Sequence, residues 1–233
     1  MSDHVAGRHA VHACLVSGFV SQLLVEEQGR GLEEFIVLAQ QKKIHIKNVS
    51  RRELDRQSQG APHQGVMALL LPYPYATLES VLALNADLIL VLDQIQDPRN
   101  LGAIIRSAAA FGVGAIICPK DNSSPVSGVV HETSSGLTAK VPIARVANLC
   151  RALAALKERG FWIYGADGDS ACDLPKTRLN SPCVIVMGGE GDGMRRLTRE
   201  MCDVVFKIPM APHVESLNVS VASAIVLYEF RRT

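Results

Sequence analysis

The chain has 233 residues, 48% of them apolar, which is enough to build the core of one large domain or of two small ones. Its formal net charge of +1 excludes a global electrostatic attraction to nucleic acid or to a membrane surface. The six cysteines form no CxxC pair and no metal-ligand spacing, so we expect a reducing, cytoplasmic compartment and no metal site. The first residues carry no signal-peptide pattern, and the longest apolar run, Val66–Leu71, is too short to span a bilayer.

The first part of the chain alternates between helical and strand patterns. In chain order, the spacing of apolar residues predicts a helix at 9–16, a strand at 19–25, a helix at 32–41 and strands at 44–49 and 66–71. Two prolines within 71–76 then favour an extended connection. We therefore expect a small α/β domain at residues 1–72, a linker at 73–80 and a larger domain at 81–233.

Strands and helices alternate again after this linker, which predicts a parallel sheet covered by helices on both faces. The predicted strands lie at 88–92, 115–118, 162–165, 184–187 and 204–208, and the predicted helices at 100–111, 149–158, 194–201 and from Ser216 onward. Ser216 is a suitable N-cap for the last helix. That helix is apolar on nearly every side, so we expect it to be buried with the rest of the domain around it.

The first candidate motif follows a predicted strand and runs from Asp97 to Gly102 into a helix that carries Arg106. Asn100 can cap this helix, and the unpaired N–H groups of a helix N-terminus favour an anion such as phosphate. Arg106 lies off the apolar stripe of the helix. An ordinary capped helix with a solvated arginine remains an open alternative for this motif taken alone.

The second candidate motif is the glycine-rich segment 187–193, directly after another predicted strand. It fails both the dinucleotide GxGxxG pattern and the phosphate-binding P-loop pattern, because Met194 stands where each needs another residue. The pattern GxGxG at Gly189, Gly191 and Gly193 resembles the cofactor loop of Rossmann-like methyltransferases. In that fold the loop follows the first strand, whereas here too few residues remain after it. A glycine turn without a ligand also stays open.

The third candidate motif is the segment 208–222, which joins a strand to the last helix. Together with Asn100-x-Gly102-x-x-x-Arg106 and Gly188–Gly193, it resembles the SpoU (TrmH-like) branch of the knotted SPOUT methyltransferases, from Leu88 to the C-terminus. The segments 7–11 and 62–66 resemble the small RNA-binding domain of the same family. The resemblance implies a parallel sheet with a C-terminal trefoil knot, S-adenosylmethionine as cofactor and a homodimer.

The resemblance also assigns roles to individual residues. Gly188, Ile208 and Leu217 would bind the cofactor, largely through backbone groups. The implied catalytic and substrate-facing set is Asn100, Arg106, Glu190, Ser216 and Asn218. The sequence departs from the family at Pro212, where glycine is usual, and at Ser134–Ala139, where a glutamate is missing; we assign that second segment no role.

The blocks are most similar to those of bacterial enzymes that methylate a guanosine 2′-hydroxyl in 23S ribosomal RNA. The alternatives are a tRNA ribose 2′-O-methyltransferase of the same family, a Rossmann-like methyltransferase and a non-catalytic RNA-binding protein with a vestigial cofactor site. A free guanidinium is never deprotonated at neutral pH. We therefore expect Arg106, fixed by a phosphate, to stabilise the developing alkoxide, while Glu190 positions Arg106 or the ribose.

A local cluster of positive charge in the first domain is the candidate RNA-docking surface. It is interrupted only by Glu53 and Asp55, and it consists of Lys42, Lys43, Lys47, Arg51, Arg52 and Arg56. An ordinary solvated surface of a helix and a turn is an equally open reading of this stretch.

Overall fold

The structure is a computed structural model that describes residues 3–191 and 193–232. The chain folds into two compact units. One unit consists of the chain up to Pro74 together with Val126–Ala139, and the other consists of Tyr75–Pro125 and the chain from Lys140 onward.

The first unit contains a four-stranded sheet in the order β1-β4-β2-β3, in which only β2 and β3 are parallel. Its elements are β1 (His4–Ala6), α1 (Arg8–Ser17), β2 (Val20–Glu26), α2 (Glu33–Gln41), β3 (His45–Val49), α3 (Arg51–Gln57), β4 (Val66–Leu70) and α6 (Gly128–Thr133). Side chains alternate across β2, so Leu23 and Val25 pack with α1 and α2 whereas Leu24 packs with Leu54 of α3.

The predicted helices and strands of this unit are confirmed, and three further elements, β1, α3 and α6, were missed. Strand β1 has only three residues, too few to show an alternating pattern. Helix α3 carries Arg51, Arg52 and Arg56 of the basic stretch and buries only Leu54, so its sequence shows no apolar periodicity. Its N-cap is Ser50, whose hydroxyl accepts a hydrogen bond from the Glu53 N–H at 3.3 Å.

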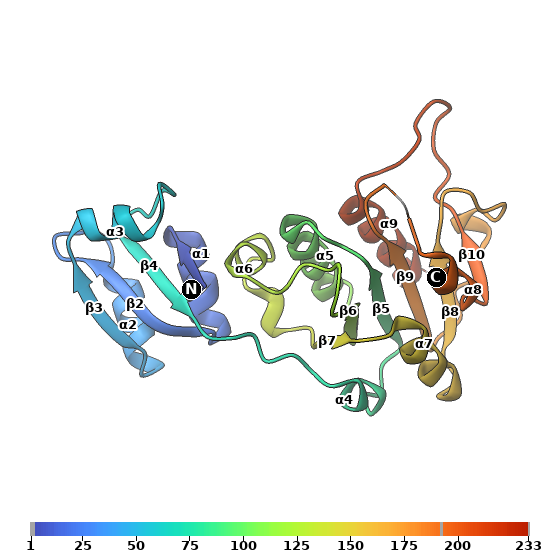
Figure 1. Ribbon diagram of the computed structural model, residues 1–233, viewed down its shortest axis with the longest axis horizontal. Helices are drawn as coiled ribbons and strands as arrows, with labels where there is room; N and C mark the ends of the chain where they lie inside the picture. Colours follow the sequence, from blue (N-terminus) through green and yellow to red (C-terminus); the bar gives the residue numbers. More distant parts are fainter. Residues whose placement is uncertain (1–2, 192, 233) are drawn as a thin grey trace. The chain divides into compact units, whose positions relative to one another are not determined.

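The second unit contains a six-stranded sheet in the order β10-β8-β9-β5-β6-β7, and every pair of neighbours is parallel (Figure 1). Its elements are α4 (Leu78–Leu82), β5 (Leu88–Asp93), α5 (Pro98–Ala110), β6 (Ala115–Pro119), β7 (Ile143–Val146), α7 (Leu149–Glu158), β8 (Trp162–Ala166), β9 (Cys183–Gly188), α8 (Arg196–Glu200), β10 (Val204–Phe206) and α9 (Val219–Arg232). The parallel sheet predicted from alternating patterns is confirmed. Strand β7 was missed, because its four residues follow a stretch that reads as irregular.

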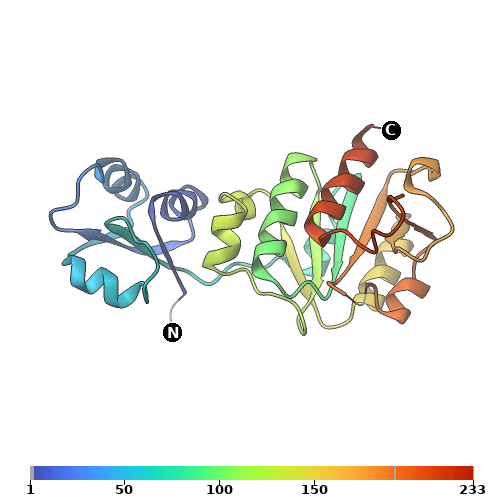
Figure 2. The ribbon, with the colours of Figure 1, turned by 90° about the horizontal axis from the view of Figure 1, so that it is seen from above.

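Helices cover both faces of this sheet, as the strand patterns predict. Figure 2 shows α5 and α9 side by side on one face and α7 on the other. The α7 face buries Ile89 and Val91 of β5 against Leu153 and Leu156 of the helix. Strand β5 is fully buried along its whole length, as a central strand between two helical layers must be.

Three predictions about helix ends and burial were wrong. The N-cap of α5 is Asp97, which accepts a hydrogen bond from the Arg99 N–H at 2.7 Å, and Asn100 lies one turn inside the helix. Helix α9 begins at Val219 rather than near Ser216, because Asn218 accepts a hydrogen bond from the Ser220 N–H at 2.9 Å. In each place two capping residue types lie within a few positions, and sequence alone does not choose between them.

The expected complete burial of the last helix was the third error. Val221 is 48% exposed and Tyr228 is 57% exposed, so α9 leaves one apolar row uncovered within this chain. Its opposite side packs on α5 and β9 through Val226 and Leu227, which are fully buried. A helix with apolar residues all round can therefore also present a face to a partner.

Candidate active site

The order of strands reverses between β5 and β9, which are neighbours in the sheet although far apart in the chain. Parallel α/β sheets bind their ligands outside the carboxyl ends of the strands at such a reversal. Here β5 leads into the N-terminus of α5, and β9 leads into the glycine loop 188–193. The first two sequence motifs therefore come together at this point.

A cleft of about 160 Å³ lies at this edge, and a wider cleft of about 840 Å³ adjoins it and shares part of its wall. Gly188, Ile208, Ser216 and Leu217, four of the residues singled out in the sequence, line the smaller cleft. Gly188 ends β9 and the other three come from the segment after β10, so separate motifs form one wall. The apolar part of this wall includes Met187, Ile208, Met210, Leu217, Val219 and Ala222.

The glycine loop owes part of its composition to its own backbone. A Cβ at Gly188 would lie 2.2 Å from the carbonyl carbon of Gly193, and a Cβ at Gly189 would lie 2.6 Å from the carbonyl oxygen of Gln94. The Gly189 N–H donates to the Gly193 carbonyl at 3.1 Å and closes the loop. These two glycines are therefore required whether or not a ligand is bound. By contrast, a Cβ at Gly168, which also lines the cleft, would meet nothing within 4 Å.

A buried carboxylate fixes the far side of the glycine loop. Asp93, at the end of β5, is 0% exposed. Its Oδ1 accepts from the Nε of Arg195 at 2.8 Å, and its Oδ2 accepts from the Arg195 N–H at 3.0 Å. Because a buried carboxylate without a cationic partner is strongly unfavourable, this ion pair ties the segment after the loop to the central strand.

A directed chain of hydrogen bonds joins three of the predicted catalytic residues. The Nδ2 of Asn100 donates to Oε1 of Glu190 at 2.5 Å, and the Nδ2 of Asn218 donates to Oδ1 of Asn100 at 3.0 Å. Oδ1 of Asn218 in turn accepts from the hydroxyl of Ser220 at 2.6 Å. Since an ionised carboxylate only accepts, Glu190 fixes the orientation of the Asn100 amide and, through it, that of Asn218. The four side chains form one connected network at the surface.

Arg106 is placed apart from this network. It is exposed on α5, away from the buried stripe of Leu101, Ile104 and Ile105. It makes no hydrogen bond or ion pair with any residue in the described ranges 3–191 and 193–232. Its guanidinium is therefore available for an external anion, and its role in the site remains a prediction.

The residues after β8 belong to the site but were not singled out in the sequence. Asp167 and Gly168 line both clefts, and Glu215 does so from the loop before α9. Oδ2 of Asp167 accepts from the Nε of Arg199 at 2.8 Å, which places a cation at the rim of the wider cleft. Their position in the chain could have identified Asp167 and Gly168 as site residues, because they directly follow a predicted strand of the same sheet.

The described residues contain neither a membrane-spanning helix nor a cluster of metal ligands. Within the described residues, no helix is long and apolar enough to cross a membrane. The same residues contain no group of three His, Cys, Asp or Glu side chains arranged to hold a metal ion.

The fold and the cleft define an α/β protein with a ligand site at the carboxyl ends of a parallel sheet, and comparison with known proteins identifies its family. Residues 87–228 match the SpoU rRNA Methylase family, and residues 4–76 match the RNA 2′-O ribose methyltransferase substrate-binding family. This chain belongs to the SpoU rRNA methylase family.

Relatives of known name support this assignment. The chain is 42% identical over 236 residues to the 23S rRNA (guanosine-2′-O-)-methyltransferase RlmB of Vibrio vulnificus, covering 98% of this chain and 96% of the relative. It is 46% identical over 190 residues to the RlmB of Vibrio cholerae, covering 80% and 77% of the two chains. The AdoMet-bound rRNA methyltransferase of Sinorhizobium meliloti has the same fold, with a TM-score of 0.83 at 24% identity over 99% of this chain and 87% of that one.

Proposed function

We propose that this protein transfers a methyl group from S-adenosylmethionine to the ribose 2′-hydroxyl of a guanosine in 23S ribosomal RNA. Membership of the SpoU rRNA methylase family and the similarity to the two Vibrio enzymes support this activity. The observation that carries the proposal is the site itself. Gly188, Ile208 and Leu217 line one cleft, and the Asn100–Glu190–Asn218 network joins the same two segments of chain to the first turn of α5.

The cleft suits S-adenosylmethionine. Its apolar wall, which includes Met187, Leu217 and Ala222, can cover an adenine ring, and the loop backbones offer polar groups at the edges of the ring. The carboxylate of Glu215 complements the positive charges of a sulfonium and an ammonium group, whereas the Asp167 carboxylate is already paired with Arg199. When bound, the cofactor supplies an electrophilic methyl group.

The protein's own residues would orient and activate the ribose. A 2′-hydroxyl is a weak nucleophile until its proton is accepted and the developing charge on oxygen is stabilised. The Glu190 carboxylate, held by Asn100 at 2.5 Å, can accept a hydrogen bond from the ribose. Arg106, anchored by a phosphate of the RNA, would place its guanidinium beside the developing alkoxide. Recognition of a 2′-hydroxyl makes RNA rather than DNA the substrate.

We further propose that the protein acts as a homodimer. Val221, Ile225 and Tyr228 are 48%, 37% and 57% exposed and recur on one side of α9. Such a row on the surface of a single chain suits a second copy related by two-fold symmetry. Light scattering should report twice the mass of the chain, and Ile225→Asp should halve it, whereas Val37→Asp on an exposed position of α2 should not.

We also propose a role for each part of the chain and a knotted topology for the second domain. Residues 1–72 would bind RNA, residues 73–80 would link, and residues 81–233 would form the methyltransferase domain, with a trefoil knot closed by its last strand and helix. A cytoplasmic location agrees with six free cysteines. Pulling the chain from its two ends tests the knot, because a knotted chain stops extending before it reaches its full contour length.

A direct test uses purified protein, S-adenosylmethionine and in vitro transcribed 23S ribosomal RNA. Ribose methylation is then mapped by mass spectrometry of nuclease fragments. The proposal predicts a single methylated guanosine. Methylation of transfer RNA alone would favour the tRNA-modifying alternative, and binding of RNA without any methyl transfer would favour the non-catalytic one.

A further inference from the structure

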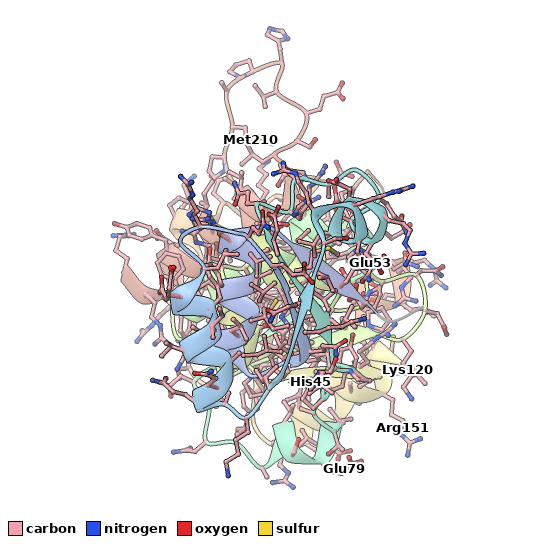
Figure 3. The ribbon with its side chains drawn as sticks, turned by 90° about the vertical axis from the view of Figure 1, so that its left-hand side faces the viewer. His45, Glu53, Glu79, Lys120, Arg151 and Met210 are labelled. Atoms are coloured by element: carbon pink, nitrogen blue, oxygen red, sulfur yellow. The ribbon has the colours of Figure 1, made fainter. Side chains whose placement is uncertain are left out.

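A second cavity, of about 880 Å³, lies at the same carboxyl edge of the six-stranded sheet, but after β6 and β7. It shares no lining residue with either cleft of the active site. Lys120 directly follows β6, Arg145 lies on β7, and Arg151 lies in the first turn of α7. Figure 3 shows Lys120 and Arg151 near one another, with Glu79 of α4 beside them.

The side chains around this cavity carry an excess of positive charge. Three cations, Lys120, Arg145 and Arg151, face a single carboxylate, Glu79. The first turn of α7 contains no acidic residue, so the partial positive charge of the helix N-terminus adds to the field of the cations. The cavity therefore has the electrostatics of an anion site, in contrast to the near-neutral charge of the whole chain.

Arg145 is held in place and still has a donor to spare. Its Nη2 donates to the Lys120 carbonyl oxygen, and its guanidinium carbon lies 5.4 Å from the centre of the Tyr75 ring. Its Nε is buried and has no hydrogen-bond partner among the described residues. This Nε is closed off from solvent, but a guanidinium carries five N–H donors, so an anion in the cavity can accept from its remaining Nη groups. The arginine is thus pre-oriented for a ligand, which reduces the entropic cost of binding.

We propose that this cavity binds a backbone phosphate of the RNA substrate, at a point separate from the methylated nucleotide. The inference rests on the proposed RNA substrate. Lys120 and Arg151 are exposed at the rim, as suits a phosphate carried on a long chain. The Tyr75 ring is in contact with Arg145, which disfavours stacking of a free nucleotide's base on it. Because the cavity and the active site share one edge of the sheet, one RNA can contact both.

The experiment compares two double variants that remove the same charge. Lys120→Ala/Arg151→Ala removes the two exposed cations of the cavity. Lys140→Ala/Arg159→Ala removes one exposed lysine and one exposed arginine of the same unit outside it. RNA affinity is measured over a series of salt concentrations with the 23S RNA fragment that the unaltered protein binds. The cavity variant should lower the salt slope by about one for each phosphate that is no longer neutralised. The control should keep the slope.

Equal slopes for the two variants would overturn the inference. A second contrary result combines two measurements. Calorimetry would show that guanosine 5′-monophosphate binds the unaltered protein but not the cavity variant, while the salt slope for RNA stays unchanged. The occupant of the cavity would then be a free nucleotide, and the inference would be overturned. Methyl transfer by the unaltered protein is measured in parallel. If transfer fails while the cavity variant still loses salt dependence, the proposed function fails and the phosphate site stands.

Discussion

The smaller cleft of the active site, the glycine-lined cleft, and the second cavity around Arg145, the basic cavity, lie on one edge of the same sheet. They differ in the composition of their walls. The cleft is formed by loop backbone, apolar side chains and the carboxylates Asp167 and Glu215. The cavity presents Lys120, Arg145 and Arg151. The difference shows that a parallel sheet supplies the position of a site, whereas the side chains after each strand decide whether a cationic cofactor or an anionic phosphate fits it.

The largest expected effect concerns the ion pair between the buried Asp93 and the half-exposed Arg195, which holds the cleft and has no counterpart in the cavity. Arg195→Ala should cost about 3 kcal/mol in free energy of unfolding, the low end for a buried ion pair, because it leaves the fully buried Asp93 carboxylate without its cation while Arg195 itself is 46% exposed. Arg196→Ala removes an exposed pair with Glu200 and should cost only about 0.3–0.5 kcal/mol. The single tryptophan, Trp162 on β8, reports urea unfolding of this unit. Similar losses for the two variants would contradict the role given to the buried pair.

The next effect is on the chemical step beside the cleft. Arg106→Ala should lower the single-turnover rate of methyl transfer roughly a hundredfold or more, since one donor aimed at a developing oxyanion contributes about 3 kcal/mol. Arg106→Lys should restore little, because an ammonium lacks the planar fork that engages phosphate and hydroxyl together. The fold should be intact, since Arg106 is exposed. Arg159→Ala is the control, and a near-normal rate for Arg106→Ala would make it an ordinary surface residue.

A smaller effect on the methyl-transfer rate should follow when the Asn100 donor of the hydrogen-bond network is replaced by an acceptor. Asn100→Asp removes the donor to Glu190 and places two carboxylates side by side, so the rate should fall about tenfold, the size of a missing hydrogen bond to a charged group. Adding Glu190→Gln restores a donor opposite the introduced aspartate and should recover the rate at neutral pH; failure to do so would show that Glu190 acts by its charge.

Sequence patterns predicted the parallel sheet because most of its strands are apolar and its long helices α5 and α7 have a clear apolar stripe, as Leu101, Ile104 and Ile105 show. They also located the glycine loop, since four glycines in six residues stand out from any background. They could not show that a Cβ at Gly188 would collide with the backbone of Gly193, because these two residues approach one another only in the folded loop. Likewise, the cations of the basic cavity are scattered over three segments and form no motif.

The most direct measurement is calorimetric titration of S-adenosylmethionine into three proteins: the unaltered chain, Ala222→Leu and Lys120→Ala/Arg151→Ala. Ala222 lines the glycine-lined cleft and neither the wider cleft nor the basic cavity, so the larger side chain fills the first without touching the last. Ala222→Leu should abolish binding, while Lys120→Ala/Arg151→Ala should retain the affinity of the unaltered protein. Unchanged affinity in a folded Ala222→Leu protein, or loss of binding in Lys120→Ala/Arg151→Ala, would contradict it.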